Sequence, residues 1–116
     1  MRVCFAGTGD AFGSGGMQTC IHVACGGQVR LVDCGATSLV ALRAQGLDPS
    51  AVDGVAVTHL HGDHFGGLPF LILDDQFSRR SAPLLVAGPP GIRTRLAEAM
   101  ETLFPGSGQG TPAVPG

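Results

Sequence analysis

The stretch Val55-Ala56-Val57-Thr58-His59-Leu60-His61-Gly62-Asp63-His64 decides how this sequence folds. Its beginning, residues 55–58, is a β-branched run without a helical period, which predicts a buried strand. Its end places three of the four histidines of the chain, together with one aspartate, within six residues. The strand would deliver this histidine cluster to the mouth of a sheet, where α/β proteins place their sites.

The residue types of the cluster point to metal binding, because histidine and carboxylate are ligands that first-row divalent metals favour. Residues 59–67 contain three glycines, so we expect a loop here rather than a helix that happens to be polar. In such a loop His59 and His61 can point one way, while Asp63 and His64 turn toward a neighbouring position. Two metals a few ångströms apart would then receive two ligands each. The other interpretation, histidines without a metal, is disfavoured by the density of the cluster.

The composition describes one folded domain with an ordinary core. The chain has 116 residues, of which 44% are hydrophobic and 14% charged. Its net charge of −2 gives no electrostatic footprint for nucleic acid or an anionic membrane. A nucleic-acid substrate stays open, since a catalytic metal carries local positive charge. No apolar run approaches the ~20 residues of a membrane span and no secretory signal is present, so we expect a cytoplasmic protein without a membrane segment.

The four cysteines, Cys4, Cys20, Cys25 and Cys34, lack the C-x-x-C spacing of a structural zinc site. Three of them lie in or beside apolar, strand-like runs, so we expect reduced core thiols at Cys4, Cys20 and Cys34. A redox or disulfide protein is therefore disfavoured.

Periodicity predicts a mixed α/β sheet flanked by helices. The predicted strands cover residues 2–6, 19–24, 28–33, 55–58 and 84–87, with Gly26-Gly27 turning the second into the third as a hairpin. The predicted helices cover residues 37–45, 68–77 and 92–104, with a further single turn after Asp48-Pro49. These elements make one domain over residues 1–105, and the Gly/Pro-rich segment 106–116 is predicted to be a disordered tail.

Several motifs resemble one known family. His59-x-His61-x-Asp63-His64 after a strand that ends in threonine is similar to the signature of the metallo-β-lactamase superfamily, and Asp33-Cys34-Gly35 resembles its first motif. The glycine-rich residues 7–16, the run 64–70 and Gly88-Pro89-Pro90-Gly91 resemble the branch that contains ribonuclease Z. The resemblance covers residues 1–106 and implies the N-terminal half of the four-layer αββα metallo-β-lactamase fold.

The same resemblance implies a dinuclear site for Zn²⁺, with Mn²⁺ or Fe as alternatives. His59 and His61 would hold the first metal and Asp63 and His64 the second, with Asp63 also counted as catalytic. A hydroxide bridging the two metals would be the nucleophile. Asp33 would hold residues 59–67, called here the metal loop after its predicted role, from behind by hydrogen bonds. The substrate loop would contain Gly7, Gly9 and Gly13.

The sequence departs from the family pattern because no histidine follows His64. Each metal would have two ligands, whereas a catalytic zinc needs about three from the protein. We therefore expect a fragment, a truncated product or one half of a split enzyme, with weak metal binding and negligible hydrolysis by the chain alone.

Two hypotheses about function follow. The first is a metal-dependent hydrolase, ribonuclease Z-like, that acts on a small-molecule phosphodiester or related ester, with RNA as a further possible substrate. The alternative is a catalytically inactive half-domain that binds metal weakly or needs a partner chain to complete its fold. Such a half-fold would expose an apolar sheet face, so we expect self-association or a complementing chain.

Overall fold

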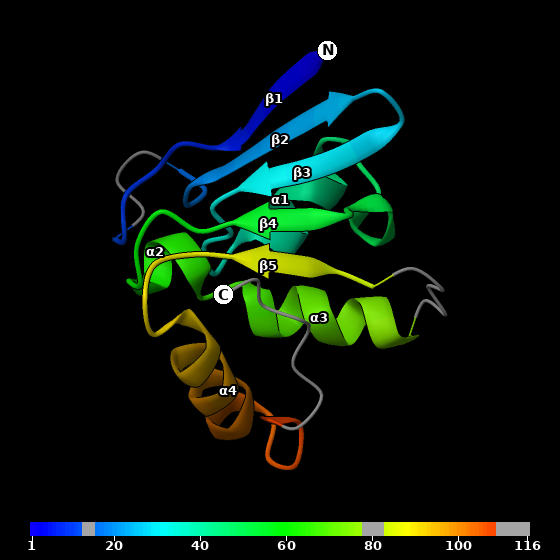
Figure 1. The fold of residues 1–116 in the computed structure, drawn as a ribbon. Coiled ribbons are helices and arrows are strands. Elements are labelled where there is room, and N and C mark those ends of the chain that lie inside the picture. Colours follow the sequence, from blue (N-terminus) through cyan, green and yellow to red (C-terminus); the bar gives the residue numbers. More distant parts are fainter. Residues whose placement is uncertain (13–15, 78–82, 109–116) are drawn as a thin grey trace.

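In the computed structural model, which describes residues 1–12, 16–77 and 83–108, five strands form one mixed sheet. Their spatial order follows the sequence: β1 (Arg2–Gly7), β2 (Cys20–Cys25), β3 (Gln28–Val32), β4 (Gly54–Ala56) and β5 (Leu85–Ala87). The first three strands pair antiparallel, and β4 and β5 join them in parallel (Figure 1). The prediction of a mixed sheet is confirmed.

The turn between β2 and β3 follows from its two glycines. Gly26 and Gly27 have φ values of 60° and 81°, and Cys25 pairs with Gln28 across them. A two-residue hairpin loop with positive φ at both central residues matches the twist of the flanking strands, and glycine adopts such angles without steric cost. The predicted hairpin is confirmed.

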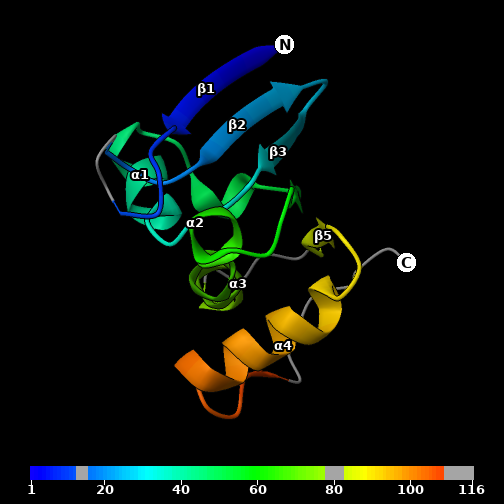
Figure 2. The same ribbon diagram turned by 90° about the vertical axis from the view of Figure 1, so that its left-hand side faces the viewer.

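The helices lie on one side of the sheet. Figures 1 and 2 show α1 (Ser38–Ala44), α2 (Gly62–Phe65) and α3 (Leu68–Phe77) against one sheet face, with α4 (Ile92–Leu103) beside α3. A short 3₁₀ turn, η1 (Pro49–Ala51), begins at Asp48, whose side chain accepts a hydrogen bond from the Ser50 backbone N–H. The helices predicted over residues 37–45, 68–77 and 92–104 are thus present, with ends that differ by at most a residue. None of the helices in the described part of the chain has the length and apolar character needed to cross a bilayer.

One row of side chains across the sheet forms the strand side of the core. The side chains of residues paired across neighbouring strands point to the same face of the sheet, so the strand register determines which residues form this row. It runs through Cys4, His22, Leu31, Val55 and Val86. The centre of this row is fully buried against apolar residues of the helices, which include Leu42, Leu68, Leu71, Leu96 and Met100.

The buried thiols and the buried histidine of this core are in forms that suit an apolar environment. The four cysteines are free; Cys20 and Cys34 are buried, whereas Cys25 is exposed. Burial raises the pKa of Cys34 to about 12 and also raises that of Cys20. Burial likewise lowers the pKa of His22, which favours its neutral form. Two of the predicted core thiols are therefore buried, and Cys4 is partly buried.

The opposite face of the sheet is apolar and open. Phe5, Leu85 and Val3 are 63%, 48% and 47% exposed there, and no helix in the described part of the chain covers them (Figure 2). A cavity of about 390 Å³ hollows this face between the β2–β3 turn and β5, with Arg30 and Leu85 in its wall. A monomer that leaves several large apolar side chains together in water is unusual. The structure thus shows the exposed apolar sheet face that the sequence predicted.

The metal loop differs from the sequence prediction, because it contains a helical turn. α2 (Gly62–Phe65) forms where residues 59–67 were predicted to be loop. The His61 carbonyl oxygen accepts hydrogen bonds from the N–H groups of His64 and Phe65 at 2.9 and 3.1 Å. Gly62 and Gly66, at the two ends of this turn, keep the helix short. They do not prevent a single helical turn, since one turn needs few hydrogen bonds.

The boundary of the predicted tail also differs. The N–H groups of Gly106 and Gly108 donate to the Glu101 carboxylate at 2.9 and 3.1 Å, and these bonds lower the Glu101 pKa. Ser107 donates its hydroxyl to the Met100 carbonyl oxygen. The first three residues of the segment predicted as tail therefore fold back onto α4, and residues 109–116 lie outside the described residues.

Candidate metal centre

The site begins with a backbone turn at Asp33, directly after β3. Asp33 has φ 63°, which is the left-handed region that aspartate tolerates better than most residues. Its N–H donates to the Ala56 carbonyl oxygen at 2.8 Å, and this bond extends the β3–β4 pairing by one residue. The turn therefore places the Asp33 carboxylate under the loop that leaves β4.

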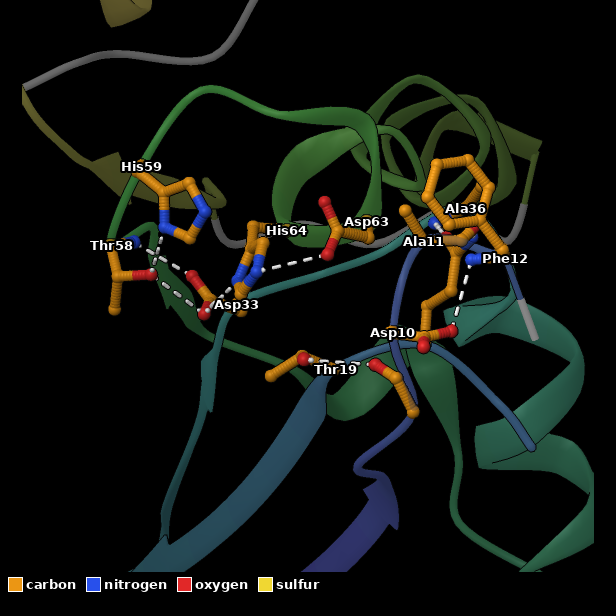
Figure 3. Close-up of polar contacts among 12 residues, drawn as sticks. Asp10, Ala11, Phe12, Thr19, Asp33, Ala36, Thr58, His59, Asp63 and His64 are labelled. Carbon is orange, nitrogen blue, oxygen red and sulfur yellow. Dashed lines mark hydrogen bonds and ion pairs between the residues drawn. The ribbon is translucent and has the colours of Figure 1, made fainter. Parts of the chain in front are cut away.

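The Asp33 carboxylate accepts three hydrogen bonds from that loop (Figure 3). Oδ1 accepts from the Thr58 N–H at 2.7 Å, and Oδ2 accepts from the Thr58 hydroxyl at 2.8 Å. The Nδ1 of His64 lies 2.7 Å from the same Oδ2. Asp33 is buried, and a buried carboxylate is stable only when its oxygens are hydrogen-bonded. The predicted role of Asp33, to hold the loop from behind, has the geometry it needs.

These contacts fix which nitrogen of each imidazole carries a proton. A carboxylate only accepts, so the Nδ1 of His64 must donate to Asp33 and its Nε2 is left with a lone pair. The Thr58 hydroxyl has one proton, which goes to Asp33, so the Nδ1 of His59, 3.1 Å from Thr58 Oγ1, must donate as well. In their neutral form both histidines would therefore present Nε2 as the acceptor, which is the state in which imidazole binds a metal.

Three side chains of the cluster meet in a group that fits a metal ion. His59, Asp63 and His64 each offer one ligand atom, and these atoms lie within 4.8 Å of one another. The Nε2 of His64 lies 3.2 Å from Asp63 Oδ2. A cation that replaced a proton between these two atoms would be held by both of them. Imidazole nitrogen and carboxylate oxygen are also the donors that Zn²⁺ prefers.

His61 lies apart from the close group of three. The ring centroid of His59 lies 3.7 Å from that of His64 but 5.0 Å from that of His61. His61 is exposed and is not part of the close group of three. The structure thus groups His59 with Asp63 and His64, whereas the sequence paired His59 with His61. That His61 binds a metal stays a prediction.

The metal loop is fastened to the β3–α1 turn by backbone as well. The Cys34 N–H donates to the His64 carbonyl oxygen at 2.7 Å, and the Gly67 N–H donates to the Cys34 carbonyl oxygen at 2.9 Å. A Cβ at Gly67 would overlap the Gly35 carbonyl oxygen, and one at Gly35 would overlap the Asp63 carbonyl oxygen. Only residues without a side chain allow the two segments to approach this closely.

A cleft of about 820 Å³ opens beside the group of three. Its walls come from four places: the loop after β1 with Phe12, the start of α1 with Ala36, the metal loop with His61 and Asp63, and α4 with Arg95. This volume is in the range of ~300–1,000 Å³ typical of small-molecule sites. The metal loop therefore borders a space large enough for a substrate.

The glycine-rich loop contributes to this cleft through other residues than those predicted. Gly7 and Gly9 are buried, and a Cβ on either would overlap the backbone of residues 16–18. They let the loop fold back on itself, while the wall consists of Asp10, Ala11 and Phe12. Gly13 lies outside the described residues.

The roles of two residues of the site were not predicted from the sequence. Thr58, noted there only as the end of the strand before the histidines, connects Asp33 to His59. Gln18 accepts from the Ala36 N–H at 2.7 Å and donates to the Ala11 carbonyl oxygen at 3.1 Å, which ties the glycine-rich loop to the start of α1. Both act through partners that are distant in sequence or depend on side-chain direction, so pattern alone does not reveal them.

Comparison with known proteins places this geometry in a family context. The family model described as anti-Pycsar protein Apyc1 matches residues 1–102. The anti-Pycsar protein Apyc1 of Paenibacillus sp. (strain J14) is 35% identical over 85 residues, 73% of this chain and 35% of that protein. Ribonuclease Z of Methanothermobacter thermautotrophicus is 39% identical over 93 residues, 79% of this chain and 30% of that protein.

Solved structures give the same picture of the fold. The human tRNase Z short form superposes with a TM-score of 0.78 and 34% identity, over 89% of this chain and 40% of that one. The metallo-β-lactamase fold protein YhfI of Bacillus subtilis superposes with a TM-score of 0.53 and 25% identity, over 65% of this chain and 32% of that one. The chain spans 28% to 34% of three ribonuclease Z relatives that it matches.

Replacing the charge of Asp33 tests the role of its carboxylate. Asn tolerates the left-handed backbone, so Asp33→Asn keeps the turn but gives the Thr58 and His64 donors a poorer acceptor. We expect zinc affinity to fall about 10–100-fold, as for other residues that orient metal ligands. Competition with a chromogenic zinc chelator measures this change. The control is Asp53→Asn, which alters a carboxylate that accepts from the Val29 N–H away from the site. Equal losses in both variants would contradict the role of Asp33.

The close approach at Gly67 gives a second prediction. Gly67→Ala forces the metal loop away from Gly35, so we expect the free energy of unfolding to fall by about 1–3 kcal/mol. Gly62→Ala is the matched control, because a Cβ there meets nothing within 4 Å; its effect should stay within about 0.5 kcal/mol. Urea unfolding followed by circular dichroism measures both. Similar stability of the two variants would show that the loop is not packed as described.

Proposed function

Because the chain belongs to the anti-Pycsar protein Apyc1 family and shares the metallo-β-lactamase fold with ribonuclease Z relatives, we propose that it carries the front part of a metal-dependent phosphodiester hydrolase site. The observation that supports this proposal most strongly is the group His59, Asp63 and His64, anchored by Asp33 at the edge of an open cleft. Zn²⁺ is the cofactor we propose, with Mn²⁺ or Fe as alternatives.

Each residue of the candidate site would have a distinct role in binding the metal or the substrate. His59 and His64 present Nε2 lone pairs, Asp63 adds an anionic oxygen, and Asp33 keeps both imidazoles in the tautomer that binds a metal. Bound Zn²⁺ supplies Lewis acidity, which lowers the pKa of water toward neutrality and offsets charge that develops on a phosphodiester or ester oxygen. His61 lies at the wall of the cleft, where it would contact the substrate or add a further ligand.

The substrate class comes from the relatives. Ribonuclease Z and tRNase Z are named for action on RNA, so RNA is one candidate. A small-molecule phosphodiester or related ester is the other, because the net charge of −2 provides no long basic track for a polynucleotide. Proteins of one fold catalyse many different reactions, so the residues of the cleft, and not the fold, determine the substrate.

A second candidate function is a half-domain that binds metal without turnover. Two observations favour it: the described donors make one close group of three, and the sheet has an uncovered apolar face. In that case a complementing chain or a second copy would provide the missing ligands and cover the sheet. The location that we expect for either form is the cytoplasm.

Zinc content and turnover test the proposed function. We expect the chain to bind zinc weakly, because the described residues bring one close group of three donors together and offer no second such group. His64→Ala should abolish this binding, because it leaves two donors, fewer than the three protein ligands of a catalytic zinc site. His22→Gln, which removes an imidazole outside the cluster, should leave zinc binding intact. Elemental analysis after gel filtration measures the metal, and hydrolysis of bis(4-nitrophenyl) phosphate measures turnover. We expect negligible turnover by the monomer and activity only in a self-associated fraction.

The outcomes separate the candidates. Zinc binding that survives His64→Ala would place the metal elsewhere and contradict the proposal. Zinc bound without turnover in every fraction would favour the non-catalytic half-domain. Robust turnover by the monomer would contradict the incomplete set of ligands.

The open sheet face predicts self-association. Burial of Phe5 and Leu85 against another surface would remove apolar area from water, so we expect a concentration-dependent increase in mass by analytical ultracentrifugation. Phe5→Glu should weaken association, since a charge would have to be desolvated. Val40→Glu is the matched control: Val40 is also 63% exposed but lies on α1. A wild-type chain that stays monomeric at all accessible concentrations would contradict this prediction.

A further inference from the structure

The open face of the sheet has a composition that a solvated sheet face does not have. Nine of the ten residues that form its two central rows have no polar side-chain atom. One row is Val3, Val23, Arg30, Gly54 and Leu85, and the other is Phe5, Ile21, Val32, Ala56 and Ala87. A sheet with one face on a core and the other in water has polar residues at its outward positions. The two rows are therefore those of a covered face.

The single charged side chain of the two rows is held toward one end of the sheet. Arg30 donates from Nη2 to the Gln28 side-chain oxygen at 2.8 Å. Gln28 is the first residue of β3 and lies beside the β2–β3 turn. The guanidinium group is thus directed to the turn end of the face, and the remainder of both rows is apolar.

The face is high at one edge of the sheet and low at the other. Val3 and Phe5 on the edge strand β1 are 47% and 63% exposed, and we call them the ridge. Gly54, Ala56 and Ala87 on β4 and β5 line the cavity of about 390 Å³, and we call them the hollow. A Cβ at Gly54 would meet only ordinary van der Waals contacts, and its φ is not in the left-handed region. Packing within the chain therefore does not require a residue this small in the hollow.

A ridge and a hollow on one face fit a second copy of the same face. Homodimers are most often related by a two-fold axis, so that the same patch is used by both copies. An axis parallel to the strands and above the middle strand β3 lays β1 of one copy over β5 of the other. Phe5 then lies opposite Ala87 of the partner copy, and Val3 lies opposite its Leu85. An axis perpendicular to the strands would instead set ridge against ridge and leave both hollows empty.

We propose that the open face is the interface of a homodimer in which the ridge of each copy fills the hollow of the other. The axis along the strands keeps the two sheets aligned, as in sheets that pack face to face. The strands β3 and β4 of both copies then end at the same edge of the dimer, and both metal loops lie there. This shared edge rests on the proposed function, because one chain brings together one close group of three donors. The pairing of the two faces does not depend on it.

The sign of one substitution tests how the faces pair. Ala87→Phe adds apolar area to the open face, and an aromatic residue suits a strand. It also fills the hollow opposite Phe5, so we expect self-association to weaken about tenfold, because two phenyl rings would compete for one space. Sedimentation equilibrium in EDTA measures the change without bound metal. Val40→Phe is the control, since it adds the same ring on α1 and should not weaken association.

Two other arrangements predict the opposite sign. An apolar face that associates without defined geometry would bind more tightly after Ala87→Phe, because more apolar area is removed from water. A two-fold axis perpendicular to the strands would also give tighter association, because the new rings would fill two empty hollows. Stronger or unchanged association of Ala87→Phe would therefore overturn the proposed pairing.

A compensating substitution separates the pairing from any loss of fold. Phe5→Ala removes the ridge and should also weaken association. Phe5→Ala combined with Ala87→Phe in one chain exchanges ridge and hollow, so we expect the double variant to regain most of the affinity that either single variant loses. In a mixture of the two single variants, the mixed dimer should exceed both homodimers, and native mass spectrometry distinguishes the three species by mass. Losses that simply add in the double variant, or a mixture without excess mixed dimer, would overturn the proposal.

The outcome is separable from that of the proposed function. A dimer with the expected response to Ala87→Phe but without zinc binding would support the pairing and contradict the metal centre. Zinc bound by a chain that stays monomeric would support the metal centre and overturn the homodimer, and the open face would then belong to a different partner. Competition with a zinc chelator tests the shared edge: we expect the wild-type dimer to bind zinc more tightly than Ala87→Phe. Equal zinc affinity of the two would overturn the shared edge.

Discussion

The carboxylate of Asp33 is the interaction on which the candidate site depends. It is buried at the end of β3, where it receives two hydrogen bonds from Thr58 and one from His64. A charge in this position would be costly without those donors, and the donors would be unsatisfied without the charge. The Asp33 carboxylate and its donors on Thr58 and His64 therefore hold each other in place, and the loop after β4 has one favourable position. The imidazole tautomers follow from the same bonds, so the structural anchor also sets the chemistry of the ligands.

The sheet beneath this anchor has two faces with different roles. On one face, a row of buried side chains packs against the helices. The parallel pairing of β3 with β4 places the ends of these two strands side by side, which brings Asp33 under the metal loop. On the other face, apolar side chains such as Phe5 and Leu85 are exposed, and Leu85 borders an open hollow. The first face accounts for the stability of the fold. The second leaves apolar side chains in contact with water.

The cleft and the metal group are adjacent but are built from separate parts of the chain. The metal group comes from one loop of six residues, whereas the cleft wall joins the loop after β1, the start of α1 and α4. The histidine loop is tied to the sheet by the hydrogen bonds of Asp33. The part of the wall that contains Phe12 and Arg95 is exposed.

The sequence by itself determined the elements and the loop that contains the candidate metal ligands. Strands and helices follow from period-two and period-3.6 patterns, the hairpin from Gly26-Gly27, and the ligand candidates from three histidines within six residues. All of these signals are local, so they are readable without a fold. The tertiary structure decided the rest: that α2 forms, that His59 meets His64 more closely than His61, and that Thr58 connects His59 to Asp33. These facts depend on contacts between residues 25 to 31 positions apart and on side-chain directions, which hydrogen bonding and packing set only once the chain has folded.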